Sequence, residues 1–187
     1  MPDDDFGYTA WGRDWVRLAQ PLRQTRPNPL LPRARKLARL GGVQVTIDGR
    51  VVRGVVQRGR TASVAAIEVA PMPPEVIAGI TGHLCGARPL LTDEVHRAIT
   101  EAGHSPAPIL AGVDCSCPDG SGSCIHVLAV YYEMARRVDD DPRIALDVQE
   151  FSRVSSGSTR VATAALPQQR WIALNALDPA DYFTVSK

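Results

Sequence analysis

Four residues with metal-binding side chains lie within twelve positions of this 187-residue chain. They are spaced as Cys115-x-Cys117-x6-Cys124-x-His126, and proline and glycine between the two pairs allow the chain to reverse direction. Three thiolates and one imidazole form a tetrahedral donor set that favours zinc over magnesium or calcium. Because four protein ligands leave no open coordination position, the sequence predicts one structural Zn²⁺.

Two other interpretations of these cysteines are a buried core position and a disulfide. Buried core cysteines with a hydrogen-bonded histidine are common in proteins, but four ligand types rarely cluster this closely by chance. A disulfide is disfavoured because Cys115 and Cys117 are separated by a single residue. A metal site is therefore the preferred interpretation.

The ends and composition of the chain favour a cytoplasmic protein, and nucleoid association is compatible with this. No stretch reaches the roughly 18 to 20 apolar residues of a membrane span. The start, Met1–Asp5, is acidic, unlike the basic and apolar start of a signal peptide. The reducing cytoplasm also favours metal binding over disulfides. We expect neither a membrane partner nor a small-molecule substrate.

Positive charge is concentrated in the first third of the chain. Residues 6–60 contain twelve basic side chains and two acidic ones, a balance of +10, although the whole chain has a formal net charge of +1. Arginine suits bidentate contacts with phosphates and carboxylates. The candidate residues for binding nucleic acid or another partner are Arg23, Arg26, Arg33, Arg35, Lys36, Arg39, Arg50, Arg53, Arg58 and Arg60. A solvated face is the competing interpretation.

The periodicity predicts an α+β fold, in which a small antiparallel β-meander packs with a few helices and a ββα-like zinc finger in one domain. Alternating apolar residues around Asp48-Gly49 predict a hairpin over 42–57, and 62–69 continues the meander. Helices are expected from Thr9 or Asp14 to near Pro21, over 74–83, over 92–102, and from Cys124 or Ile125 to about Val138.

Four segments are expected along the chain. Residues 1–5 form a flexible N-terminus, and 6–151 form the zinc-binding domain. Within that domain the proline- and arginine-rich residues 21–41 are expected to be an exposed basic loop. Residues 152–170, rich in serine, glycine and threonine, indicate a linker. Residues 171–187 form a C-terminal tail with enough apolar side chains to dock.

The two ligand pairs followed by a helix resemble the SWIM zinc-finger signature. The resemblance covers roughly residues 6–151 and includes Phe6–Trp15, the arginine-rich stretch to Gly41, the Gly42–Gln57 hairpin, Cys115–Asp119 and Asp139–Pro142. It implies a zinc module that binds DNA or protein, in bacteria often with Swi/Snf-type helicase ATPases and in eukaryotes with recombination factors and transposases. Ile125 stands where the family usually has a basic residue, which argues against phosphate contact by the finger itself.

Two functions are compatible with these features. The first is a zinc-binding accessory module for DNA and/or a DNA-processing protein, since arginine–phosphate contacts release counterions. The alternative is a protein-interaction scaffold without direct DNA contact. The N-terminal aromatics could stack on unpaired bases, but a hydrophobic anchor is the preferred interpretation. No enzyme is expected, because the sequence lacks a phosphate-binding Gly-Lys-Ser/Thr loop and a dinucleotide fingerprint, and Cys85 beside His83 is interpreted as a small buried residue.

Overall fold

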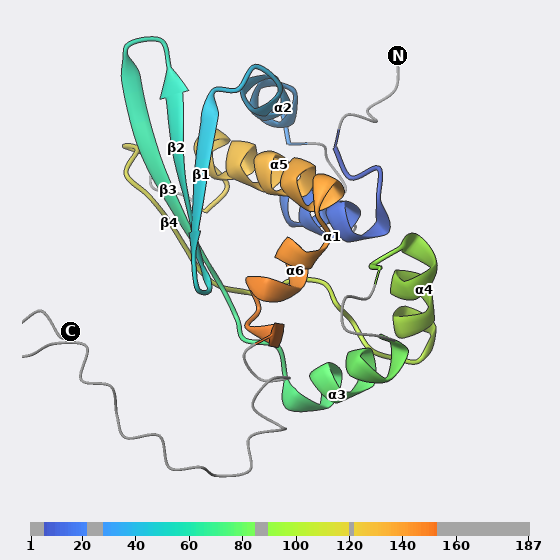
Figure 1. Cartoon of the computed structure of the whole chain (residues 1–187). Helices are drawn as coiled ribbons and strands as arrows, with labels where there is room; N and C mark the ends of the chain where they lie inside the picture. Colours follow the sequence, from blue (N-terminus) through green and yellow to red (C-terminus); the bar gives the residue numbers. More distant parts are fainter. Residues whose placement is uncertain (1–5, 22–27, 85–89, 120–121, 153–187) are drawn as a thin grey trace, which may run out of the picture.

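The computed structural model describes residues 6–21, 28–84, 90–119 and 122–152. These residues form helices on one side of a four-stranded antiparallel sheet (Figure 1), which confirms the predicted α+β class. In chain order the elements are α1 (Ala10–Ala19), α2 (Leu31–Arg39), β1 (Val43–Asp48), β2 (Val51–Arg58), β3 (Thr61–Val69), α3 (Pro74–His83), α4 (Asp93–Glu101), β4 (Leu110–Cys115), α5 (Ile125–Asp140) and α6 (Arg143–Asp147). Among the described helices, none is both long and apolar enough to cross a membrane.

The sheet is a meander in the order β1-β2-β3-β4. Its first hairpin turns at Gly49, whose φ of 56° is in the left-handed region that glycine adopts without steric cost. Strand residues alternate between the two faces. Val45, Val52 and Ile67 are therefore buried against the helices, whereas Val55 and Val64, paired across β2 and β3, are exposed on the other face.

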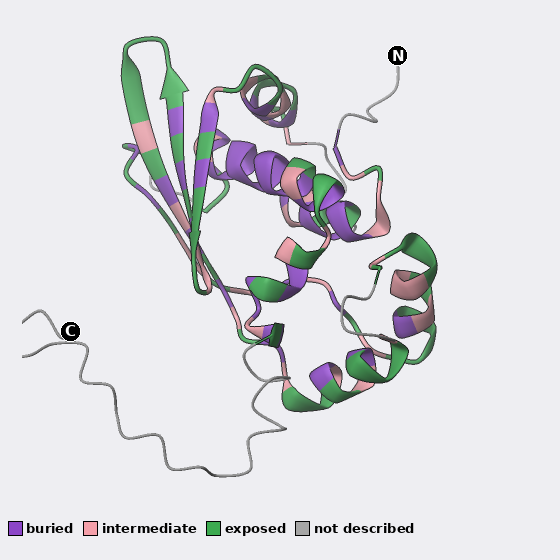
Figure 2. Ribbon diagram, viewed as in Figure 1, coloured by how far each residue is buried: buried purple, intermediate pink, exposed green. Residues whose placement is uncertain are grey.

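Helix α5 is the centre of the core. It contacts all four strands as well as α1 and α2, and most of its surface is buried (Figure 2). Gly54 of β2 allows this close approach, because a Cβ atom there would lie 2.2 Å from Cγ2 of Val130. The missing side chain on β2 thus fixes how closely the helix and the sheet pack.

The N-terminal aromatic stretch is a hydrophobic anchor, as predicted. Trp11 and Trp15 of α1 are buried, and the ring of Phe6 lies 5.2 Å from that of Tyr132 on α5. Tyr8 differs from its neighbours, since its side chain is 56% exposed. The buried rings cannot stack on bases without unfolding.

Asp139 at the end of α5 attaches this anchor to the domain. Its carboxylate accepts hydrogen bonds from the backbone N–H of Gly7 at 2.6 Å and from the backbone N–H and hydroxyl of Thr9 at 2.9 and 2.7 Å. The Thr9 hydroxyl in turn accepts from the backbone N–H of Gly12 and so caps α1, which selects Thr9 from the two expected starts, Thr9 and Asp14. One buried carboxylate therefore holds the first turn of α1 against the last turn of α5.

The prediction of an exposed loop over residues 21–41 is wrong for most of the second half of that range, because Leu31–Arg39 form α2. Proline is compatible with the first turn of a helix, where its missing N–H has no intrahelical partner. The spacing of Leu31, Ala34 and Ala38 places three buried side chains on one face. Strand β4 and helix α6 were also not predicted.

Several predictions lie outside the described residues. These are the flexible residues 1–5, the candidate ligand-binding Arg23 and Arg26, residue Cys85, the tail 171–187 and all of the linker 152–170 except Ser152.

Candidate metal centre

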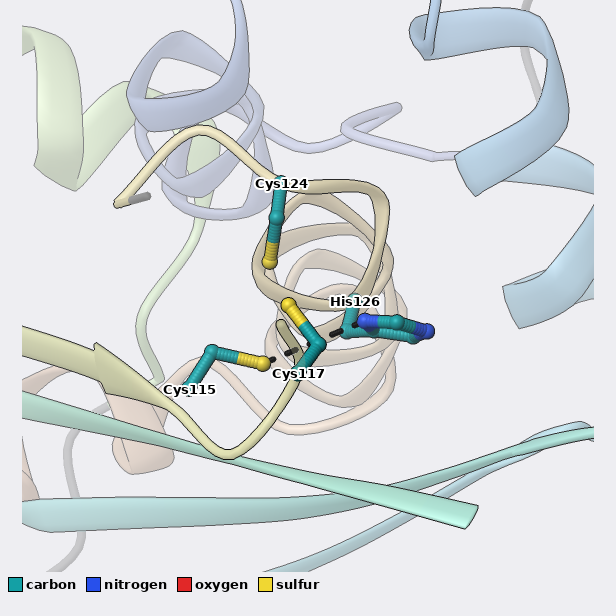
Figure 3. A group of neighbouring side chains, drawn as sticks. All are labelled: Cys115, Cys117, Cys124 and His126. Carbon is teal, nitrogen blue, oxygen red and sulfur yellow. Dashed lines mark hydrogen bonds between the residues drawn. The ribbon is translucent and has the colours of Figure 1, made fainter. Parts of the chain in front are cut away.

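The four predicted ligands converge between the end of β4 and the start of α5. Cys115 is the last residue of β4, Cys117 follows it, Cys124 is the N-cap residue of α5 and His126 lies in the first turn of α5. Their ligand atoms all lie within 4.8 Å of one another. Figure 3 shows the three sulfurs and the imidazole grouped together, with Sγ of Cys115 3.9 Å from Nδ1 of His126.

Local hydrogen bonds place these side chains. Ser116 bonds twice to Val64 of β3: its N–H donates to the carbonyl oxygen at 2.9 Å, and its hydroxyl accepts from the Val64 N–H at 2.9 Å. Cys115 and Cys117 are therefore attached to the end of the sheet. Cys124 has extended backbone angles at the N-cap, and its side chain makes no capping hydrogen bond, so the sulfur is available to a metal.

The distances fit a tetrahedral metal ion. With metal–sulfur bonds near 2.3 Å and metal–nitrogen bonds near 2.0 Å, tetrahedral ligand atoms are about 3.5 to 3.8 Å apart. The separation of 3.9 Å between Cys115 and His126 is close to this range, and the largest separation, 4.8 Å, needs a small contraction. The group could therefore hold a metal ion.

Burial shifts the pKa values of two of the ligands, Cys115 and His126. Desolvation is the main reason that the pKa of Cys115 rises to about 12, so this thiol is protonated at neutral pH. The pKa of His126 is lowered, first by burial and then by the positive charge of Arg58. The imidazole is therefore neutral at pH 7, the form that binds metals.

Part of the predicted basic surface comes together beside this centre. Arg33 and Lys36 of α2 and Arg58 at the end of β2 surround a hollow of about 270 Å³, whose other lining residues are Leu37, Leu40 and Ile125. We call this the α2 hollow. Among the described residues its three cations form no ion pair. Because Ile125 stands between Cys124 and His126, the α2 hollow adjoins the metal centre.

Two other predicted binding residues, Arg35 and Arg50, instead make contacts within the protein. The Arg35 guanidinium lies 5.4 Å from the centre of the Tyr132 ring, and its Nε donates to the Tyr132 hydroxyl at 3.1 Å. Arg50 donates to the Val69 carbonyl at 3.1 Å and pairs with Glu68 and Glu150 at 3.4 and 3.6 Å. These two guanidinium groups already have partners within the protein, and their role in binding another molecule stays a prediction.

Arg53 lies near the Gly49 turn, 4.0 Å from the carboxylate of Asp48. It is five residues along β2 from Arg58, or roughly 17 Å at about 3.3 Å per residue. It therefore lies away from the α2 hollow. Arg39 and Arg60 are exposed, on α2 and in the turn after β2 respectively.

Leu37, Leu40 and Ile125, which line the α2 hollow, were not predicted as site residues. The only sequence signal was Ile125 itself, an apolar residue between two metal ligands where the SWIM-like pattern has a basic one.

Comparison with known proteins finds no family model that matches this chain, and neither a curated protein nor a solved structure matches it. The functional argument therefore depends on the residues described above.

Proposed function

We propose that this chain is a zinc-folded accessory module that binds DNA and/or a DNA-processing protein, and that it has no catalytic role. The observation that carries the proposal is the position of Arg33, Lys36 and Arg58 around the α2 hollow, beside a group of four metal ligands. The resemblance to SWIM zinc fingers supports a Swi/Snf-type helicase or a recombination factor as the protein partner.

Zinc is the ion that suits this donor set best. Three thiolates and a neutral imidazole match its preference for sulfur and nitrogen ligands, and four protein ligands close its coordination shell. The bound site has a formal charge of −1, which the positive N-terminal end of α5 partly offsets. Ordering the loop between β4 and α5 has an entropic cost that metal binding offsets. Zinc thereby holds Ile125 and the adjoining α2 hollow in place.

DNA is the first candidate partner. Three cations without intramolecular ion pairs among the described residues can approach phosphates without first breaking a contact. Each phosphate that they neutralise releases condensed counterions, so the affinity falls as salt rises. Arg60 is exposed in the turn after β2, two residues from Arg58, and adds a further positive charge to this end of the sheet.

The test is a set of anisotropy titrations of the zinc-loaded protein with single- and double-stranded DNA, from about 50 to 200 mM salt. The triple variant Arg33→Glu/Lys36→Glu/Arg58→Glu is expected to bind at least about tenfold more weakly, with a salt slope smaller by about 2 to 3. Arg53→Glu, at the other end of β2, is the matched control and should bind like the wild type. Equal losses in both variants would contradict the proposed surface.

A scaffold without DNA contact is the second candidate, and the apolar residues of the α2 hollow favour it. Leu40 is 71% exposed beside Leu37 and Ile125, so an apolar side chain of a partner protein could be buried there. If the scaffold is correct, both DNA forms bind weakly at all salt concentrations. In that case Leu40→Ser should release a co-purifying protein that Arg53→Glu retains.

A further inference from the structure

A second group of arginines lies between α1 and α4. Arg13 and Arg17 are one turn apart on α1, and Arg97 is on α4. They line a hollow of about 350 Å³, here called the α1–α4 hollow, with Ala10, Asp93, His96 and Thr100. None of these residues belongs to the metal centre or to the α2 hollow, so this surface requires a separate explanation.

The two helices that carry these arginines are held together by direct contacts. The backbone N–H of Ala10 donates to the Asp93 carboxylate at 2.8 Å, and Nε1 of Trp11 donates to the Thr92 carbonyl at 3.2 Å. The Trp11 ring also meets His96 edge-on, with ring centres 5.0 Å apart. The backbone positions from which the arginines extend are therefore fixed, which lowers the entropic cost of binding a ligand between them.

Arg17 is oriented by a buried carboxylate. Asp14 is only 4% exposed, and its two oxygens contact Nη1 of Arg17 at 3.0 Å and Nε2 of His96 at 2.8 Å. A guanidinium has five N–H donors, so Arg17 keeps most of them available after this contact. Asp14 therefore holds Arg17 at the α1–α4 hollow without using up its donors.

The lining has an excess of positive charge. Among the described residues, Arg13 and Arg97 form no ion pair. Asp93 is the one carboxylate among the seven lining residues, and one of its oxygens already accepts from Ala10. Three guanidinium groups at one hollow repel each other, and a bound anion would relieve this repulsion.

We propose that the α1–α4 hollow binds the phosphoryl group of a phosphorylated ligand, with Arg13, Arg17 and Arg97 as the donors. The planar guanidinium matches two phosphate oxygens at once. The lining contains no large aliphatic side chain, unlike the α2 hollow, so the charged group of the ligand is what it recognises. The phosphoryl group could belong to a small phosphorylated molecule or to the end of a nucleic acid.

The test is an NMR titration of the full, zinc-loaded, ¹⁵N-labelled chain with inorganic phosphate, at an ionic strength held constant with chloride. The Nε–H signals of Arg13 and Arg97 are expected to shift and to saturate. Arg13→Gln and Arg97→Gln should each weaken binding about tenfold, as expected for loss of a charge-assisted hydrogen bond. Asp93→Asn, which keeps an oxygen for Ala10 but removes the negative charge, should strengthen it. Arg143→Gln on α6 is the control and should bind like the wild type.

Thymidine oligonucleotides with and without a 5′-phosphate then identify the source of the phosphoryl group. Binding that requires the 5′-phosphate assigns the site to nucleic-acid ends, and binding of inorganic phosphate alone assigns it to small phosphorylated molecules. Either result supports the proposal. It is overturned if no arginine signal saturates in the wild type, or if Arg143→Gln weakens binding as much as Arg13→Gln. None of these outcomes depends on the residues of the α2 hollow. The titrations with the triple variant therefore test the proposed function separately.

Discussion

At the scale of single residues, Asp139 connects the end of α5 to the N-terminal anchor. It accepts three hydrogen bonds from Gly7 and Thr9 while being only 6% exposed. Asp139→Ala would leave two backbone N–H groups without their acceptor, so we predict a loss of about 2 to 4 kcal/mol in the free energy of unfolding. Urea denaturation of the zinc-loaded protein measures this.

Asp140→Ala is the matched control for this prediction. Asp140 is the adjacent residue, its side chain is 63% exposed, and it pairs with Arg136 at 3.3 Å on the helix surface. An exposed pair of this kind contributes less than about 1 kcal/mol. Equal destabilisation by the two substitutions would show that Asp139 does not hold the N-terminal anchor.

Sequence reasoning found the four metal ligands because their spacing is local, but it could not separate the arginines by role. Arg33 and Arg35 are two positions apart on α2, yet one lines the α2 hollow and the other packs on Tyr132. Arg50 pairs with Glu68 and Glu150, both distant in the sequence. Only the tertiary contacts show which guanidinium groups are available to a partner.

At the scale of elements, the packing of α5 on the sheet depends on one glycine. Gly54→Ala places a methyl group 2.2 Å from Cγ2 of Val130, so the helix or the strand has to move. We predict a loss of about 1 to 3 kcal/mol, the usual cost of overpacking a core. Gly112→Ala in β4 is the control, since its nearest atoms lie 3.9 Å from the new methyl group. Thermal melts that show no difference between the two variants would contradict this packing.

The elements also show where sequence patterns are sufficient. The hairpin β1–β2, with its Asp48-Gly49 turn and alternating valines, and the amphipathic α4 with Thr92 as its cap were predicted close to their observed bounds. Strand β4 shows no alternation of buried and exposed residues, since only Cys115 at its end is buried and the other side chains are partly or fully exposed. Its position is set by pairing with β3, in which Ala65 lies opposite Cys115. The two residues are about 50 positions apart in the sequence. A non-local partner of this kind leaves no periodic signal.

At the scale of the whole molecule, the metal centre joins the sheet to the central helix, since its ligands come from the end of β4 and the start of α5. Cys117→Ala removes one of four ligands. We predict that it loses stoichiometric zinc and that its melting temperature falls by several degrees or more, because metal binding is coupled to folding. Elemental analysis and circular dichroism measure both effects. Ser123→Ala, an exposed position in the same loop, should retain zinc and the melting temperature.

The same coupling makes zinc affinity depend strongly on pH. In the metal-free protein burial raises the pKa of Cys115 to about 12, so zinc must displace its proton. The lowered pKa of His126 means that the imidazole is already neutral and releases no proton at pH 7. Between pH 8 and 6.5, the apparent zinc affinity should therefore fall by about tenfold or more per pH unit. Competition with a chromophoric chelator measures the affinity, and calorimetry in two buffers of different ionisation enthalpy counts the protons. An affinity that does not change over this range would mean that the Cys115 thiolate does not bind the ion.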